Sequence, residues 1–154
     1  MNLVFKILVL IAFILNSEYS PAQKIEHKKI IGQIATVKVK EGEIKFTGRV
    51  DTGAKTTSIN AKKIMQKGDS VKFTIVNKQG QKFSMITKIA DERYVFNAEK
   101  REKRYYVYLT LEYNGITKRA LVNLNDRSKS TYKILLGRNW LNGDYIVDVS
   151  IDRL

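Results

Sequence analysis

The chain has 154 residues, a length that predicts one domain with at most a short additional segment. It contains 28 lysines and arginines, 15 acidic residues, one histidine and no cysteine, which gives a formal net charge of +13. These counts exclude disulfides, cysteine-based zinc sites, a cysteine nucleophile and any site that needs two histidines of one chain, while the charge indicates an anionic partner such as nucleic acid, an envelope surface or an acidic substrate.

The first residues have the composition of a targeting segment. Lys6 precedes an unbroken apolar run, ILVLIAFIL, over residues 7–15, and a short polar stretch then ends in the small-x-small pattern SPA at residues 20–22. The apolar run is shorter than the about 20 residues that span a bilayer. We therefore predict a signal peptide over residues 1–22 and an exported protein, periplasmic or secreted after cleavage near Ala22, with an uncleaved anchor as the alternative. Export makes nucleic acid an unexpected partner.

The chain that follows alternates between apolar and polar residues. Residues 23–29 are polar and are predicted to form a solvated leader. The alternation has the two-residue period of a half-buried strand and predicts strands over residues 34–39 and 44–50. The pattern breaks over residues 51–60, and residues 61–66 are predicted to form one short helical turn.

The second half of the chain continues as strands joined by tight turns. Residues 71–75 and 82–89 predict a hairpin with a four-residue connection, and the charged segment 91–104 is expected to be a solvated loop or a sheet edge. Asn114-Gly115 is the strongest hairpin signal, because a type I′ turn needs a positive φ at both central residues. Further strands are predicted over residues 105–113, 116–124, 134–136 and 145–149, with a brief helical turn over 138–141.

No amphipathic helix of ten residues or more is predicted after the apolar N-terminal run. Seven or eight short strands at regular spacing instead predict an all-β fold. A barrel and a sandwich both fit this pattern.

Residues 48–61 (GRVDTGAKTTSINA) carry the clearest chemical signal. Their glycine spacing is that of a phosphate-binding loop, but Ala54 separates Gly53 from Lys55 and no long helix follows, so we reject a nucleotide site. The alternative is a D-T-G motif, with Asp51 at the end of an apolar strand. One aspartate is a weak base at its reference pKa of about 3.9, whereas two facing carboxylates share one proton. One of them can then activate a water while the other protonates a substrate carbonyl.

A second segment, residues 134–141 (ILLGRNWL), strengthens this interpretation. Residues 51–54 (DTGA) followed by residues 135–139 (LLGRN) resemble the retropepsin-like aspartic peptidases. Over residues 31–150 the chain is similar to a bacterial family labelled "ATP-dependent zinc protease", which is retropepsin-like and is associated with RimK-type glutamate ligases. The resemblance implies an all-β, closed barrel of short antiparallel strands with one or two short helical turns, in a domain over residues 30–154.

The resemblance also implies roles for individual residues. Asp51 is the catalytic carboxylate, Thr52 hydrogen-bonds across a dimer, and Gly53 leaves room for the water and the substrate carbonyl. Gly137 lets its strand pass close to the active loop. The residues expected on the substrate side are Ala54, Gly137 and Arg138.

One D-T-G motif per chain has a consequence for assembly, because a mechanism with two carboxylates then requires a homodimer with the site on its two-fold axis. Arg138 and the pair Asp126-Arg127 are expected either to meet acids at this interface or to remain surface ions. The hairpin over residues 71–89 is either a flap over the substrate or a plain barrel hairpin. No cofactor or metal is expected, since the chain lacks an H-E-x-x-H motif and its one histidine is His27.

Three functional hypotheses follow from these observations. The first is an exported homodimeric aspartic peptidase that hydrolyses a peptide or amide bond, with an acidic peptide as the candidate substrate of this basic chain. The second is a non-catalytic envelope module that holds an anionic polymer or peptide, suggested by Tyr105, Tyr106 and Tyr108 beside Arg101, Lys103 and Arg104. The third is a zinc hydrolase, which the family label implies.

Overall fold

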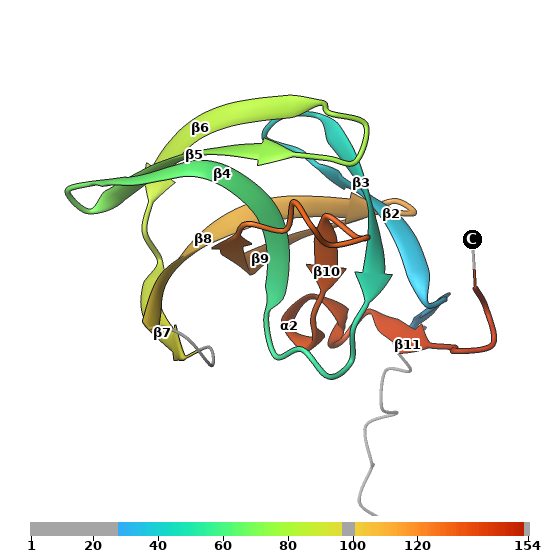
Figure 1. Cartoon of the computed structure of the whole chain (residues 1–154). Coiled ribbons are helices and arrows are strands. Elements are labelled where there is room, and N and C mark those ends of the chain that lie inside the picture. Colours follow the sequence, from blue (N-terminus) through green and yellow to red (C-terminus); the bar gives the residue numbers. More distant parts are fainter. Residues whose placement is uncertain (1–27, 97–100, 153–154) are drawn as a thin grey trace, which may run out of the picture.

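A computed structural model of the chain describes residues 28–96 and 101–152 (Figure 1). The signal peptide predicted over residues 1–22 and residues 23–27 of the leader lie outside the described residues. In the described part, eleven strands and one short helix follow the chain as β1 (Lys29–Ile31), β2 (Ile34–Val39), β3 (Ile44–Val50), β4 (Thr57–Lys67), β5 (Ser70–Val76), β6 (Lys82–Lys88), β7 (Asp91–Phe96), β8 (Arg101–Tyr113), β9 (Ile116–Asn125), β10 (Ile134–Leu136), α2 (Arg138–Leu141) and β11 (Tyr145–Val147).

Six of these strands form a closed barrel. They are hydrogen-bonded in the order β10-β3-β2-β8-β9-β4, and β4 pairs with β10 to complete the ring. The strands alternate between buried and exposed residues; β3, for example, buries every second side chain from Ile44 to Val50. The buried side chains fill the interior of the barrel. The predicted all-β closed barrel with one short helical turn is therefore confirmed.

Three pairings in this fold are parallel, although only antiparallel strands were predicted. They join β1 to β11, β10 to β3, and β4 to β9. The consecutive strands β3 and β4 do not pair with each other, because β10 lies between them, parallel to β3 and antiparallel to β4. The segment over residues 51–56 must therefore cross the end of β10, and it carries the D-T-G motif across that end.

The helical turn predicted over residues 61–66 is wrong, because this segment belongs to the long strand β4. Lys63 has a φ of +53°, and the register of β4 against β5 shifts between Lys62 and Met65. Such a bulge adds one residue to one strand and interrupts the two-residue alternation. The interruption produced the helix-like spacing of apolar residues in the sequence.

The hairpin formed by β5 and β6 extends β4 into a second sheet, drawn in yellow-green at the top of Figure 1. Val71, Phe73 and Ile75 of β5 are fully buried in the core. At its connection, the Asn77 Nδ2 donates to the backbone oxygen of Lys45 at 3.0 Å. These contacts support a plain barrel hairpin rather than a flap.

The charged segment predicted as a loop or a sheet edge contains strand β7, which pairs with the first half of β8. The resulting ribbon lies at the lower left of Figure 1. Across the described part of the chain, β7 has no other partner strand, so it is an edge. In the same part of the chain, no helix has the length and apolar character needed to cross a membrane.

Candidate active site

The D-T-G loop folds around the carboxylate of its own aspartate. The backbone N–H of Asp51 donates to Leu136 O at 3.0 Å, which fixes the end of β3 against β10. The Asp51 Oδ1 accepts the N–H groups of Gly53 at 3.0 Å and Ala54 at 3.1 Å. The Oδ2 has no hydrogen-bond partner among the described residues and remains available to a water, a proton or a second carboxylate. The two N–H groups therefore fix the orientation of the Asp51 carboxylate.

Gly137 lies where β10 passes directly beneath this loop. A Cβ atom at this position would lie 2.6 Å from the carbonyl carbon of Thr56 and 2.8 Å from the nitrogen of Thr57. These are backbone atoms that a rotamer change cannot move away. The Gly137 N–H also donates to Thr57 Oγ1 at 3.1 Å. The glycine thus permits the close crossing, while its predicted contact with substrate stays a prediction.

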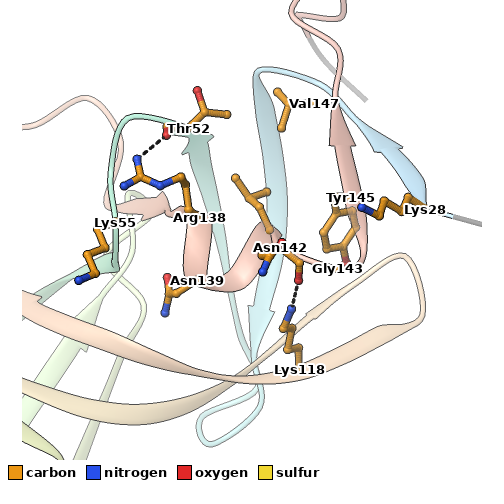
Figure 2. A pocket seen from close by; sticks show the side chains of 11 residues that line it. Lys28, Thr52, Lys55, Lys118, Arg138, Asn139, Asn142, Gly143, Tyr145 and Val147 are labelled. Atoms are coloured by element: carbon orange, nitrogen blue, oxygen red, sulfur yellow. Dashed lines mark hydrogen bonds between the residues drawn. The ribbon is translucent and has the colours of Figure 1, made fainter. Parts of the chain in front are cut away.

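The start of α2 ties the loop down through both backbone and side chain. The N–H of Arg138 donates to Ala54 O at 2.9 Å. The Arg138 Nη1 donates to the carbonyl oxygens of Thr52 at 2.8 Å and Gly53 at 2.9 Å, and Figure 2 shows the bond to Thr52. Within one chain Arg138 therefore holds the D-T-G backbone through two carbonyl oxygens, while its expected pairing with an acid at a dimer interface stays a prediction. Thr52 itself is exposed.

Asn139 is a supporting residue to which the sequence assigned no role. Its Oδ1 accepts both the N–H of Thr57 at 2.9 Å and the Thr57 hydroxyl at 3.1 Å, and its Nδ2 donates to Leu121 O at 2.8 Å. One amide side chain thereby joins α2 to β4 and β9. The signal was present in the sequence, because Asn139 ends the LLGRN motif, but its two partner residues, Thr57 and Leu121, are distant in the chain.

Arg127 lies in the segment that follows β9. Its backbone N–H donates to Asn60 Oδ1 at 2.8 Å, and its Nε donates to Tyr132 O at 3.1 Å. Burial lowers the pKa of Arg127, the nearby charge of Arg104 lowers it further, and the Asp51 carboxylate raises it.

Asp126, the neighbour of Arg127, does not pair with a basic side chain. Its Oδ1 accepts the N–H of Ser128 at 2.8 Å and also contacts the Ser128 hydroxyl. These two bonds are the main reason why the pKa of Asp126 is lowered. The expectation that it meets an acid or a base at an interface stays untested.

A cavity of about 680 Å³ borders the D-T-G loop at Thr52 and Lys55 (Figure 2). Asp51 is not part of its lining. Its basic residues are Lys28, Lys55, Lys118 and Arg138, and it is bounded also by Thr52 and Tyr145. The D-T-G loop is thus flanked by cationic side chains on this side.

No cluster of three or more His, Cys, Asp or Glu side chains that could hold a metal ion occurs in residues 28–96 and 101–152. His27 lies outside these ranges. The described residues around Asp51 supply one carboxylate and several cations, which is not a donor set for zinc.

Comparison with known proteins identifies the fold and the family. The model of the RimB-like family, described as retropepsin-like aspartic endopeptidase RimB, matches residues 30–154. The chain belongs to this family. The match supports a retropepsin-like, protease-type hydrolase and does not confirm the narrower resemblance to the "ATP-dependent zinc protease" family.

A solved structure from Legionella pneumophila subsp. pneumophila str. Philadelphia 1, a protein of unknown function (DUF785), has the same fold. The TM-score is 0.66 and the sequence identity is 24%, with 80% of this chain and 95% of that chain covered. A search of curated proteins found no match.

We expect the Gly137→Ala substitution to destabilise the crossing of β10 and the D-T-G loop. The added methyl group collides with the backbone of Thr56 and Thr57, and overpacking of this kind lowers the free energy of unfolding by about 1–3 kcal/mol. Urea unfolding measures the change. A matched glycine control is Gly68→Asn, because Gly68 has a φ of +61° with open space around it, and asparagine tolerates that conformation. Equal stability of the two variants would contradict the close crossing.

Proposed function

We propose that this RimB-like chain is an aspartic peptidase that acts as a homodimer, with Asp51 of each protomer forming one shared catalytic pair. The observation that carries the proposal is the D-T-G loop, in which Asp51 is held by two N–H groups through one oxygen while its other oxygen has no partner among the residues that the structure describes. The family match supports the same chemistry. The chain has one D-T-G motif, so the second carboxylate comes from a second copy.

The reaction follows from two facing carboxylates that share one proton. The ionised carboxylate takes a proton from a water, which attacks the substrate carbonyl carbon. The protonated carboxylate gives its proton to the carbonyl oxygen, and the resulting gem-diol collapses as a proton reaches the leaving nitrogen. Gly53 lies beside the Asp51 carboxylate. A Cβ atom added at Gly53 would be 3.2 Å from Asp51 Oδ1.

The small sheet of β1 and β11 offers a face for the second copy. Ile30 and Ile146 are direct partners in this sheet and are 57% and 56% exposed. Val149, just after β11, is 72% exposed. Exposed apolar groups that gather on one small sheet are typical of an interaction surface. The exposed Thr52 would then be placed to bond across the two-fold axis.

The substrate class that fits the chain is an acidic peptide. The chain has a formal net charge of +13, and four cationic side chains line the cavity that Thr52 of the D-T-G loop borders. Long-range attraction raises the encounter rate with an anionic substrate. Export through the predicted N-terminal segment places this substrate in the periplasm or outside the cell.

A statine-type inhibitor tests the proposal, because its secondary hydroxyl mimics the tetrahedral intermediate between two carboxylates. We expect it to block cleavage of an acidic peptide and to raise the melting temperature of the protein. The rise follows from binding to the native state alone. A protein that cleaves the peptide equally well with saturating inhibitor is not an aspartic peptidase.

A second candidate function is a non-catalytic module that binds an anionic polymer. The outer face of the β7–β8 ribbon favours it, because the Arg101 guanidinium lies 3.7 Å from the ring centroid of Tyr94 and 5.7 Å from that of Phe96. Both rings are exposed. Tyr106, one of the three tyrosines that suggested this function, is buried and does not contribute to such a surface. A chain that stays monomeric at micromolar concentration would favour this module over the peptidase.

A further inference from the structure

We propose that the outer face of the sheet formed by β4, β5 and β6 docks the protein onto a bilayer surface that carries anionic lipid headgroups. This sheet lies at the top of Figure 1, at the opposite end of the molecule from α2 and the D-T-G loop. A protein docked through this face therefore keeps its candidate active site accessible. The face is separate from that site, so docking does not depend on peptidase activity.

Strand register defines the outer face. In an antiparallel pair, residues opposite each other point to the same side of the sheet, and side chains alternate sides along each strand. Val71, Phe73 and Ile75 of β5 are buried, so the other residues of β5 point outwards. With their partners on β4 and β6 they form a surface, here called the lysine face, that consists of Lys62, Met65, Lys67, Ser70, Lys72, Thr74, Val76, Lys82, Ser84, Ile86 and Lys88.

The bulge at Lys63 decides which side chains of β4 belong to this face. Lys62 pairs with Thr74. Met65, three residues further along β4, pairs with Lys72, which is only two residues from Thr74. The extra residue of the bulge thus lets Lys62 and Met65 point to the same side. Without it, the alternation of the strand would turn Met65 towards the other side.

The lysine face is cationic and carries no acidic side chain, although Asp69 lies in the turn at its end. Its exposed basic residues are Lys62, Lys67, Lys72, Lys82 and Lys88. Within residues 28–96 and 101–152, all salt bridges lie elsewhere on the surface; Arg93, Lys103 and Arg104 of the β7–β8 ribbon, for example, each pair with an acid. Charges that are not neutralised and gather on one side produce a positive potential, which attracts an anionic surface.

Protection of an edge strand does not account for this face. Among the described strands β6 pairs only with β5, and lysines at such an edge discourage pairing with another chain. Lys72, however, is on β5, which has a partner strand on each side. Met65 and Ile86 are 50% and 57% exposed, and exposed apolar groups favour association. The face therefore has the character of a binding surface.

Its side chains favour a lipid surface over a nucleic acid. Proteins that bind single-stranded nucleic acid use aromatic rings and arginines that stack on the bases, and the lysine face contains neither. Met65 and Ile86 both flank Lys72 in one row across the sheet, about 10 Å apart. Apolar side chains set among lysines match an anionic bilayer, because they enter the headgroup region while the lysines remain at the charged surface. The targeting segment predicted over residues 1–22 would bring the chain to such a membrane.

Vesicle binding tests the lysine face. Sedimentation measures binding to vesicles of phosphatidylcholine alone and to vesicles of phosphatidylcholine and phosphatidylglycerol in equal amounts. We expect tighter binding to the anionic vesicles and a loss of this preference as salt is raised. The variant Lys67→Gln/Lys72→Gln/Lys88→Gln should bind the anionic vesicles about 100-fold less tightly, because each lysine near such a surface contributes a factor of about five. The N-terminal segment is the same in every protein compared, so its own contribution cancels.

The matched control is Lys28→Gln/Arg49→Gln/Lys55→Gln, which removes three positive charges from exposed residues outside the lysine face. It should retain most of the binding. An equal loss in the two triple variants would show that net charge alone drives binding and would overturn docking through this face. Equal binding of the native protein to both kinds of vesicle would also overturn it, including the case in which the protein binds a single-stranded oligonucleotide instead. Melting temperatures show whether each variant is folded.

The variant Met65→Ser/Ile86→Ser tests the apolar part of the contact. It keeps every lysine, and we expect it to bind the anionic vesicles about tenfold less tightly, because two apolar side chains no longer leave water. Native affinity in this variant would show that the side chains stay outside the bilayer and would overturn the bilayer as the occupant of the face. The Asp51→Asn protein should bind the vesicles as the native protein does, so docking stands or falls separately from the peptidase.

Discussion

The Asp51→Asn protein is expected to lose cleavage activity by about 10³-fold or more, because a single missing member of a catalytic pair removes most of the rate enhancement. Asparagine is nearly the same size as aspartate, and its amide oxygen can still accept the N–H groups of Gly53 and Ala54. The loop is therefore preserved while its charge and its exchangeable proton are lost. The measurement is kcat/KM on an acidic peptide, with unfolding by urea as the check on folding.

The control for this substitution is Asp69→Asn, which makes the same chemical change in the exposed turn between β4 and β5. Asp69 accepts a hydrogen bond from the Ser70 hydroxyl at 3.0 Å and lies outside the D-T-G loop. The Asp69→Asn protein should have the same kcat/KM as the native protein. Full activity in the Asp51 variant would show that the D-T-G loop is structural in this chain and would leave the ribbon surface as the better candidate for function.

Local patterns predicted much of the fold. Alternation over residues 44–50 predicted β3, and the Asn114-Gly115 turn predicted the β8–β9 hairpin, because in both cases the signal lies within the element itself. The bulge at Lys63 in β4 was not predictable in this way. It depends on pairing with β5, and its break in alternation looked like helical spacing.

In the candidate site too, features within one segment were predictable and features that depend on distant segments were not. The D-T-G and LLGRN segments could be recognised because each is contiguous in the sequence. The contacts of Asn139 with Thr57 and Leu121 could not, since they exist only because β10 enters the barrel between β3 and β4.

Mixing experiments should show that one active site needs two intact chains. With a ninefold excess of Asp51→Asn protein, random exchange of subunits leaves about one tenth of the native chains paired with a native partner, so activity per native chain falls about tenfold. A monomeric enzyme would keep its full activity per native chain in the same mixture. Activity that is unaffected by the excess would therefore contradict the shared pair.

The double variant Asp51→Asn/Ile146→Lys locates the interface in the same assay. Ile146 is exposed on the β1–β11 sheet, so a lysine there should leave the protomer folded, while pairing with a native chain would bury its charge against an apolar face. An excess of this double variant should not pair with native chains and should not reduce their activity. If it suppresses activity as strongly as Asp51→Asn alone, the two copies meet through a different surface, while the requirement for two aspartates still holds.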